Sequence, residues 1–405
     1  MGFSRDDVEN LSSVLEEPGW VLDRRLEAWE WFDKLELPGE KEEPWRYTNL
    51  AMLRFKLDRF SPAPPSAPYP MALPADVASK DVIVTDLHTA IREHPELVQK
   101  HLFSEVSRSS HIFSALHGAF FSGGTFVYVP RGVTVPIPIE VITNITEPGA
   151  AVCPHNLLVV EEGAELCFLQ RFTSGDLAEA SLSATAMEVI AGQAARVFTS
   201  TLQEFGSKVW HFEAQAASVA RDVSFQSSVA TLGGRFSRTE ASTVMRGDGA
   251  SVEMLGMYLA EQGQHFDFRT LQDHAAAHCT SDLLFKGALR GNARTVYAGL
   301  IHVRPEGAQT DAYQTNRNLI LSDDAKADSK PELEIENNDV RCSHAASVGQ
   351  MNEDEIFYLV SRGIPRPEAE RLIVKGFFEE VLGRIRRAEI SEPLHQALER
   401  KLGYE

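Results

Sequence analysis

The sequence lacks the motifs by which common catalytic and nucleotide-binding sites are recognised. It contains no G-x-S-x-G nucleophile elbow, no G-x-x-x-x-G-K-S/T phosphate loop, no G-x-G-x-x-G dinucleotide turn and no H-E-x-x-H zinc motif. The chain is therefore not expected to hydrolyse ATP, to hold a dinucleotide in the usual manner or to act as a zinc protease. Acidic residues are plentiful but no pair stands out by pattern, so glycosidase chemistry stays open.

Cysteine is scarce, and so are apolar segments long enough for a membrane. The four cysteines form no C-x-x-C pair, which excludes a zinc ribbon or a four-cysteine cluster site built by one chain. The first residues are acidic and lack the apolar core of a signal peptide, and the longest uncharged run, Ser109–Pro130, holds two His, four Ser and three Gly. We expect reduced thiols in a cytoplasmic protein without membrane association.

Composition places the chain among ordinary globular proteins. Its 405 residues are 43% hydrophobic and 24% charged, enough for two or three domains. The formal net charge is −19, most of it in the central part of the chain, and this field repels phosphate backbones. A role in nucleic-acid binding is therefore not expected.

The first 110 residues predict a helical domain with a linker. Apolar residues recur near helical spacing over 5–36, and Pro38-Gly39 ends the pattern. Six of the 13 residues from Pro62 to Pro74 are proline, which predicts an extended linker. A short strand followed by helix is expected over 80–105.

From about residue 111 to 345 the pattern is that of β-structure. Short apolar stretches rich in β-branched and aromatic residues follow one another between turn residues, as in Thr125–Val129, Val133–Ile142 and Val252–Leu259. A small residue recurs before these stretches at intervals of 31, 25, 30 and 27, at Ala164, Ala195, Ala220, Ala250 and Ala277. This loose period favours a stacked solenoid slightly over a large β-sandwich.

Residues 346–405 predict a small domain of three helices. Asn352 and Glu355 resemble a capping box that opens the first, Gly363 and Pro365 end it, and Pro367 begins the second. These helices are too short to bury their apolar surface alone, so they should pack on the β-region, on each other or on a partner.

Two metal-ligating residue types lie side by side just before these helices, in the segment Asp311–Gln350. In a strand over Val340–His344, Cys342 and His344 share a face with Cα atoms roughly 6.6 Å apart. A thiolate and an imidazole suit iron, zinc or copper, but they make only half of a four-coordinate site. The remainder must come from elsewhere in the fold or from another chain, unless Cys342 is a buried hydrophobe and His344 only a hydrogen-bonded strand residue.

A second group of candidate ligands lies upstream. His265 and Asp267 share a face if Gln264–Phe268 is a strand, and His274 and His278 share one whether they lie in a helix or a strand. These four are secondary candidates for a metal site. The alternative is that their side chains serve turn and strand hydrogen bonds.

These segments together resemble the SufB/SufD family of iron–sulfur cluster assembly proteins. The resemblance runs through GGTFVYVPRGVTVPIPIEV (123–141), the histidine-rich segment, SDLLFKGALRGNARTVYAGLIHV (281–303) and the long block 310–364, with PWRYTNL (44–50) as a weaker element. The chain is similar to the SufD branch of the family. The SufB branch carries an essential Cys 28 residues before the His that matches His344, and this chain has Asn316 there. The SufB branch also has a Glu directly after that His, where this chain has Ala345.

The resemblance implies a right-handed parallel β-helix between helical end domains, and a non-catalytic scaffold subunit. It implies pairing with SufB, docking of the SufC ATPase on the carboxy-terminal helices, and cluster formation at the SufB–SufD interface. His344 would be the contributing residue, with Cys342 beside it, and the cluster or iron would be transient and shared with SufB, with no permanent cofactor. The candidate SufC contacts are Phe357, Tyr358, Phe377 and Phe378.

Two other functions remain open from the residues alone. One is a β-helix lyase or hydrolase acting on acidic polysaccharide, which predicts a long groove lined by Asp, Lys and Arg. The other is a purely structural module in which packing buries the Cys-Ser-His strand.

Overall fold

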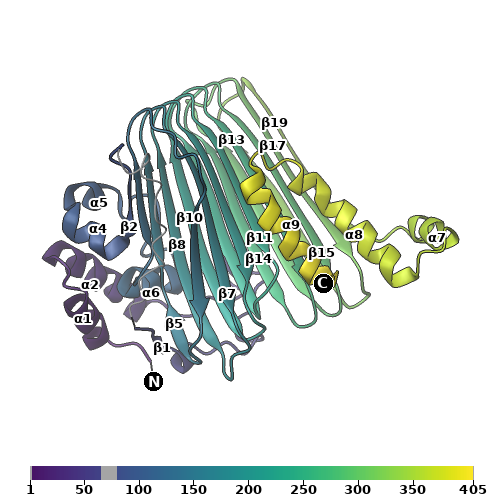
Figure 1. The fold of residues 1–405 in the computed structure, drawn as a ribbon, viewed down its shortest axis with the longest axis horizontal. Helices are drawn as coiled ribbons and strands as arrows, with labels where there is room; N and C mark the ends of the chain where they lie inside the picture. The colour runs from purple at the N-terminus through teal and green to yellow at the C-terminus, as the bar shows by residue number, and fades with distance from the viewer. Residues whose placement is uncertain (1, 65–79, 405) are drawn as a thin grey trace.

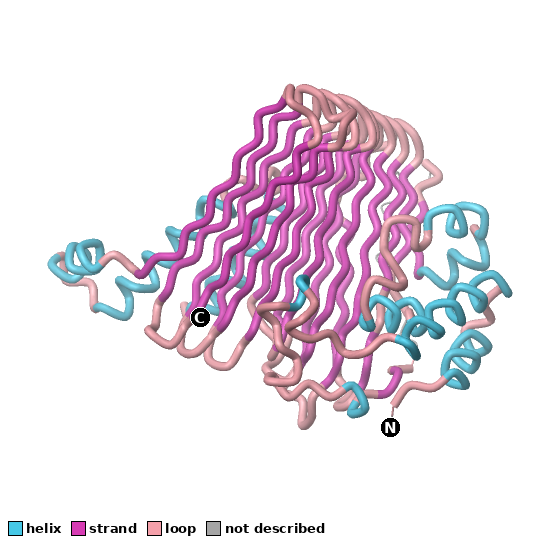
Figure 2. The backbone as a smooth tube through the Cα atoms, turned by 180° about the vertical axis from the view of Figure 1, so that it is seen from behind, coloured by secondary structure: helices cyan, strands magenta, loops and turns pink. Residues whose placement is uncertain are grey.

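The strands alternate between two parallel sheets along the chain, so that each coil contributes one strand to each sheet. The computed structural model describes residues 2–64 and 80–404 (Figures 1 and 2). One sheet has the order β18 (Lys326–Ile335), β16 (Arg294–Val303), β14 (His265–His274), β12 (Phe236–Met245), β10 (Val209–Val219), β8 (Ser181–Ala191), β6 (His155–Val160), β3 (Thr125–Val129) and β2 (Ile83–Asp86), with β1 (Ser61–Pro62) and β5 (Ala150–Val152) attached at its side. The other has the order β19 (Val340–Gln350), β17 (Thr310–Ile320), β15 (Thr280–Leu289), β13 (Ser251–Ala260), β11 (Ser224–Thr231), β9 (Arg196–Glu204), β7 (Glu165–Ser174) and β4 (Ile139–Ile145).

The pairing between successive coils is parallel throughout, and only β2 runs antiparallel to its neighbour β3 among the described strands. This confirms the predicted parallel β-helix and is incompatible with the sandwich alternative, which needs antiparallel sheets. Glu165 pairs with Arg196, a step of 31 residues, and Ser224 pairs with Ser251, a step of 27.

The predicted repeat is confirmed, but two of the five alanines that indicated it do not occupy equivalent positions in their coils. Ala164, Ala195 and Ala250 hold equivalent places, because the residue after each bonds back to the coil before. The equivalent residues in the other two coils are Val223 and Cys279 rather than Ala220 and Ala277, since Ser224 N donates to Ala195 O and Thr280 N to Ala250 O.

Side chains that alternate inward fill the space between the sheets. The apolar part of this interior includes Val127, Leu158, Val197, Val252 and Phe266, all at most 2% exposed. Several strands are buried on both faces because helices cover the sheets from outside. β10 is such a strand: its polar residues His211, Glu213 and Gln215 are buried like the apolar residues between them.

The amino-terminal helices pack on the outer face of the sheet that contains β8 and β10. They are α1 (Arg5–Val14), α2 (Gly19–Lys34), α4 (Leu87–Glu93), α5 (Pro95–His101) and α6 (Ile112–Phe120), with short 3-10 turns η1 (Glu43–Trp45) and η2 (Leu57–Arg59). The helical pattern expected over 5–36 is confirmed as two helices, separated where Glu16 has φ 52° and Pro18 precedes α2. The predicted proline-rich linker falls mostly on residues 65–79, outside the described part of the chain.

The β-region begins later than expected. Ile112–Phe120 is a helix whose nine residues are all buried, so it shows no polar face from which helical spacing could be recognised. The strand expected over Val133–Ile142 starts only at Ile139, after two prolines at positions 136 and 138. Proline lacks the N–H that a central strand would contribute.

Three carboxy-terminal helices follow the last strand, as predicted: α7 (Glu353–Ser361), α8 (Arg366–Leu382) and α9 (Ala388–Leu402). Asn352 caps α7 by accepting from Asp354 N, whereas no reciprocal bond from Glu355 completes the expected capping box. α8 and α9 cover the outer face of the second sheet, and α7 projects beyond it (Figure 1). Within the part of the chain that the structure describes, no helix combines the length and apolarity needed to cross a membrane.

Candidate functional site: the open terminal coil

The last coil of the solenoid, formed by β18 and β19, has no further coil stacked on it. β18 and β19 are the terminal strands of their sheets, so each pairs on one side only within the described chain. Their inward side chains are therefore incompletely covered: Ile335 is 42% exposed and Val348 is 49% exposed. Two unpaired strand edges around an uncovered apolar interior form a surface suited to association with another chain.

Cys342 and His344 both lie on the inward face of this coil. On β17 the buried residues Ala312 and Gln314 point into the solenoid, and Cys342 and His344 pair with them in register. Cys342 is half-buried against the small apolar cluster around Ala312, whereas His344 is exposed. The imidazole is therefore accessible at the open end and not enclosed in the core.

A line of buried polar groups leads from His344 into the solenoid. Gln314, in register beneath His344, donates through Nε2 to the Tyr297 hydroxyl at 3.0 Å, and that hydroxyl lies 2.9 Å from Thr270 Oγ1. The side-chain carbonyl oxygen of Gln314, Oε1, is buried and has no hydrogen-bond partner among the described residues. Gly299 makes room for this line, because a Cβ there would lie 2.1 Å from Gln314 Nε2 and 2.3 Å from the Tyr297 hydroxyl oxygen.

The local environment keeps the Cys342 thiol protonated in the isolated chain. Partial burial and the neighbouring Asp311 carboxylate raise the pKa of Cys342, against a hydrogen bond with the Ala312 backbone. A thiolate is the form that ligates metal. Cys342 therefore becomes a good ligand only when a cation or a new neighbour offsets the charge of its thiolate.

Asn316, the position at which the resemblance distinguishes the two family branches, lies inside the same coils. Asn316 is fully buried and donates to the Tyr258 hydroxyl at 3.0 Å and to Phe285 O at 3.2 Å. Ser329 on β18 donates to its carbonyl oxygen at 2.7 Å. A buried amide with these partners acts as an internal tie between coils.

The secondary candidates do not form one site. His265 and Asp267 share the outer face of β14, as predicted, but Thr48 of the amino-terminal segment covers them, with Oγ1 3.2 Å from His265 Nε2 and donating to Asp267 at 2.6 Å. His274 points into the solenoid, with Nε2 2.8 Å from Ser281 Oγ. His278 is exposed in the following turn, at φ 59°, in neither of the two elements considered for it.

These histidines and the aspartate have structural partners instead. Burial lowers the pKa of His265 and of His274 to about 4. Burial opposes ionisation of Asp267, but Arg238 at 2.7 Å and Arg269 at 2.8 Å keep its pKa below the usual value. Asp267 is thus a buried anchor for two arginines.

The four aromatic residues expected to contact a partner separate into two pairs. Phe357 and Tyr358 on α7 are 73% and 57% exposed. Phe377 is half-buried with Lys286 Nζ 4.2 Å from its ring centroid, and Phe378 is fully buried between α8 and the solenoid. Only the α7 pair is presented to another molecule.

The fold and the site together define the class of protein: a parallel β-solenoid that is open at one end and carries helices on both outer faces. Comparison with known families then identifies it. Residues 142–377 match the model described as "SUF system FeS cluster assembly, SufBD core domain", and residues 68–141 match the "SufBD protein N-terminal region". The chain belongs to the SufBD family of SUF-system iron–sulfur cluster assembly proteins.

Individual relatives agree over nearly the whole length. An iron–sulfur cluster assembly SufBD family protein of Mycobacterium tuberculosis is 32% identical, covering 91% of this chain and 90% of its own. The iron–sulfur cluster assembly protein SufD of Bacillus subtilis is 26% identical, covering 99% and 98%. A SufBD family protein of Staphylococcus epidermidis is 26% identical over 93% and 88%.

Proposed function

We propose that this chain is the SufD-type subunit of a cluster-assembly scaffold, and that its open terminal coil pairs with the corresponding coil of a SufB-type paralogue. The iron–sulfur cluster is the cargo, built at the junction of the two coils. His344 serves there as a ligand or proton-transfer group, with Cys342 in support. The subunit itself catalyses no nucleotide hydrolysis; that belongs to a SufC-type ATPase.

The observation that carries the proposal is the combination of an unpaired edge, an exposed apolar interior and an accessible imidazole in one coil. Strand edges attract other strands, and a second coil in register would cover Ile335 and Val348 while bringing its own side chains close to His344. A thiolate from the second chain would supply a soft ligand that the protonated Cys342 does not offer alone.

The exposed α7 surface is proposed as the ATPase contact. Phe357 and Tyr358 project from a helix that lies away from the solenoid (Figure 1). Exposed aromatic side chains are typical anchors of protein interfaces. In a complex of all three chains, Phe357→Ala with Tyr358→Ala should release the ATPase and retain the paralogue, whereas Tyr47→Ala, also an exposed aromatic, should release neither. Retention of the ATPase by the double variant would remove α7 from the interface.

The test of the site uses the chain co-expressed with its SufB-type and SufC-type partners. His344→Ala should abolish most cluster formation, measured as iron and sulfide per complex and as the rate of reconstitution, while the complex still assembles. Cys342→Ser should have a smaller effect. His278→Ala, an exposed histidine in a turn, is the matched control, and a normal rate for His344→Ala would eliminate His344 from the mechanism.

Family membership favours this role over the polysaccharide-active alternative. The exposure of the Cys-Ser-His strand argues against a module whose strand is only packing material.

A further inference from the structure

Charged side chains lie in a row on the outward face of β18, and those nearest the end of the strand form no ion pairs within the described chain. The first four outward charges form two ion pairs, each with N···O 3.2 Å: Lys326 with Asp328, and Lys330 with Glu332. The next two carboxylates, Glu334 near the end of the strand and Glu336 one residue past it, have no basic group within 4 Å among the described residues. Two like charges on one face of a strand repel each other unless a cation lies between them.

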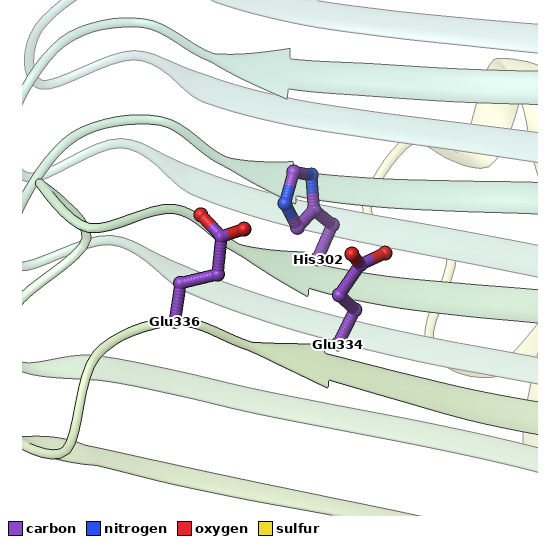
Figure 3. Close-up of side chains that lie close together, drawn as sticks. All are labelled: His302, Glu334 and Glu336. Carbon is purple, nitrogen blue, oxygen red and sulfur yellow. The ribbon is translucent and has the colours of Figure 1, made fainter.

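A histidine stands beside these two carboxylates. His302 on β16 pairs in register with Glu334 on β18, and both side chains project from the outer face. Figure 3 shows His302, Glu334 and Glu336 rising from neighbouring strands on the same side of the sheet. One ligand atom from each of the three lies within 4.8 Å of the others.

Asp273 supports the ring from the other side. It is the register partner of His302 on β14, and its Oδ1 lies 3.5 Å from His302 Nδ1. Arg304, the basic residue nearest in sequence, is engaged with Asp273 through two hydrogen bonds of 2.9 and 2.6 Å. A carboxylate beside Nδ1 favours the tautomer in which Nε2 carries the free lone pair, an arrangement common behind metal-ligating histidines.

We propose that His302, Glu334 and Glu336 form a binding site for a first-row divalent cation of the Fe²⁺, Mn²⁺ or Zn²⁺ class. One imidazole nitrogen and two carboxylates are the donors that these ions accept. His302 on β16, Glu334 on β18 and Glu336 just after β18 reach a common ion by small rotations, and water completes the coordination. Binding relieves the repulsion between Glu334 and Glu336, which Arg304 offsets only in part, because its hydrogen bonds go to Asp273 and its interaction with Glu336 is electrostatic alone.

The site is separate from the Cys342–His344 pair. His302 and Glu334 lie on the outer face of the solenoid, whereas Cys342 and His344 point inward. The inference does not depend on the proposed function, because binding is measured on the chain alone.

The experiment is a titration of the full chain with Mn²⁺, followed by electron paramagnetic resonance. The wild-type chain should bind one Mn²⁺ with a nitrogen coupling from histidine. His302→Ala should remove that coupling and raise the Kd at least tenfold, and Glu336→Gln should raise the Kd similarly. Circular dichroism checks that each variant is folded.

Glu332→Gln is the matched control, since Glu332 lies on the same face of the same strand but is paired with Lys330. It should leave the Kd within a factor of two. The proposal is overturned if wild-type and His302→Ala chains bind Mn²⁺ equally, or if Glu332→Gln weakens binding as much as Glu336→Gln.

Discussion

The two ends of the solenoid differ in how far other elements of the chain cover them. At the first coils β2 pairs antiparallel with the edge of β3, and α4 and α5 bury apolar residues such as Leu157 and Val159 against their own. In the other sheet the first strand, β4, has no further strand beside it within the described chain. At the last coil both sheets end in unpaired strands, and inward side chains such as Val348 are half exposed. The chain covers its first coils with two helices and a strand and its last coil with no comparable element among the described residues, and the last coil is the end that we propose for association with another chain.

The closed end also contains a buried ion pair. Arg25 is fully buried and donates to Glu17 at 2.7 and 2.6 Å, and also to the Ala119 and Phe121 carbonyl oxygens. Burial opposes ionisation of Glu17, but the hydrogen bonds from Arg25 and His88 hold its pKa below the usual value. The open end has no comparable ion pair among its described inward side chains.

The largest expected effect is the loss of this ion pair. Arg25→Met leaves the Glu17 carboxylate buried without its partner, so the free energy of unfolding should fall by about 3–5 kcal/mol. Urea denaturation measures it, and adding Glu17→Gln should recover a large part of the loss. Equal stability of Arg25→Met and wild type would show that the closed end does not depend on this pair.

Matched leucine truncations compare the two ends directly. Leu157→Ala at the closed end should cost about 2–5 kcal/mol because it opens a cavity under α4 and α5. Leu333→Ala at the open end should cost no more than about 1 kcal/mol in the isolated chain, because Leu333 is only partly buried. Equal losses in urea midpoint would mean that the last coil is as well packed as the first.

Acid should weaken the covered parts of the solenoid. His265 and His274 have pKa values lowered by burial to about 4, whereas an unfolded histidine titrates near pKa 6.5. Between these values the unfolded chain binds more protons, so the free energy of unfolding falls as the pH falls, by about 1 kcal/mol per histidine from pH 7 to 5.5. Urea midpoints across this range measure the slope. His274→Gln should reduce this slope, and an unchanged slope in His274→Gln would contradict the assignment.

The smallest effect on stability should accompany the greatest effect on association. Val348→Lys should change the free energy of unfolding by less than about 0.5 kcal/mol, because the side chain is already half exposed. It should nevertheless prevent co-purification with a SufB-type paralogue, since it places a charge in the apolar interior that pairing would bury. Val14→Lys on α1, where the valine is also exposed, should leave co-purification intact, and retention of the paralogue by Val348→Lys would argue against pairing through this coil.

The fold class could be predicted from the sequence, but the residues that occupy equivalent positions in successive coils could not. Ala164 and Ala195 mark equivalent places, while Val223 and Cys279 do so without resembling them, because the interior requires only a side chain that fits. The helix Ile112–Phe120 is buried on every side, so periodicity cannot separate it from a buried strand. The cation site was missed since His302 and Glu334 lie 32 residues apart and only the register makes them neighbours.

Alternation along a strand is local, so the sequence by itself determined that Cys342 and His344 share a face, and its residue patterns indicated a β-region between helices. The tertiary structure alone decided which way that face points, which histidines are covered and which end of the stack is left open. Those depend on packing between distant segments, as where Thr48 covers His265 and Asp267 while nothing in the described chain covers His344. Burial depends on how all the coils pack together, so the sequence of a single strand does not indicate which segments will cover it.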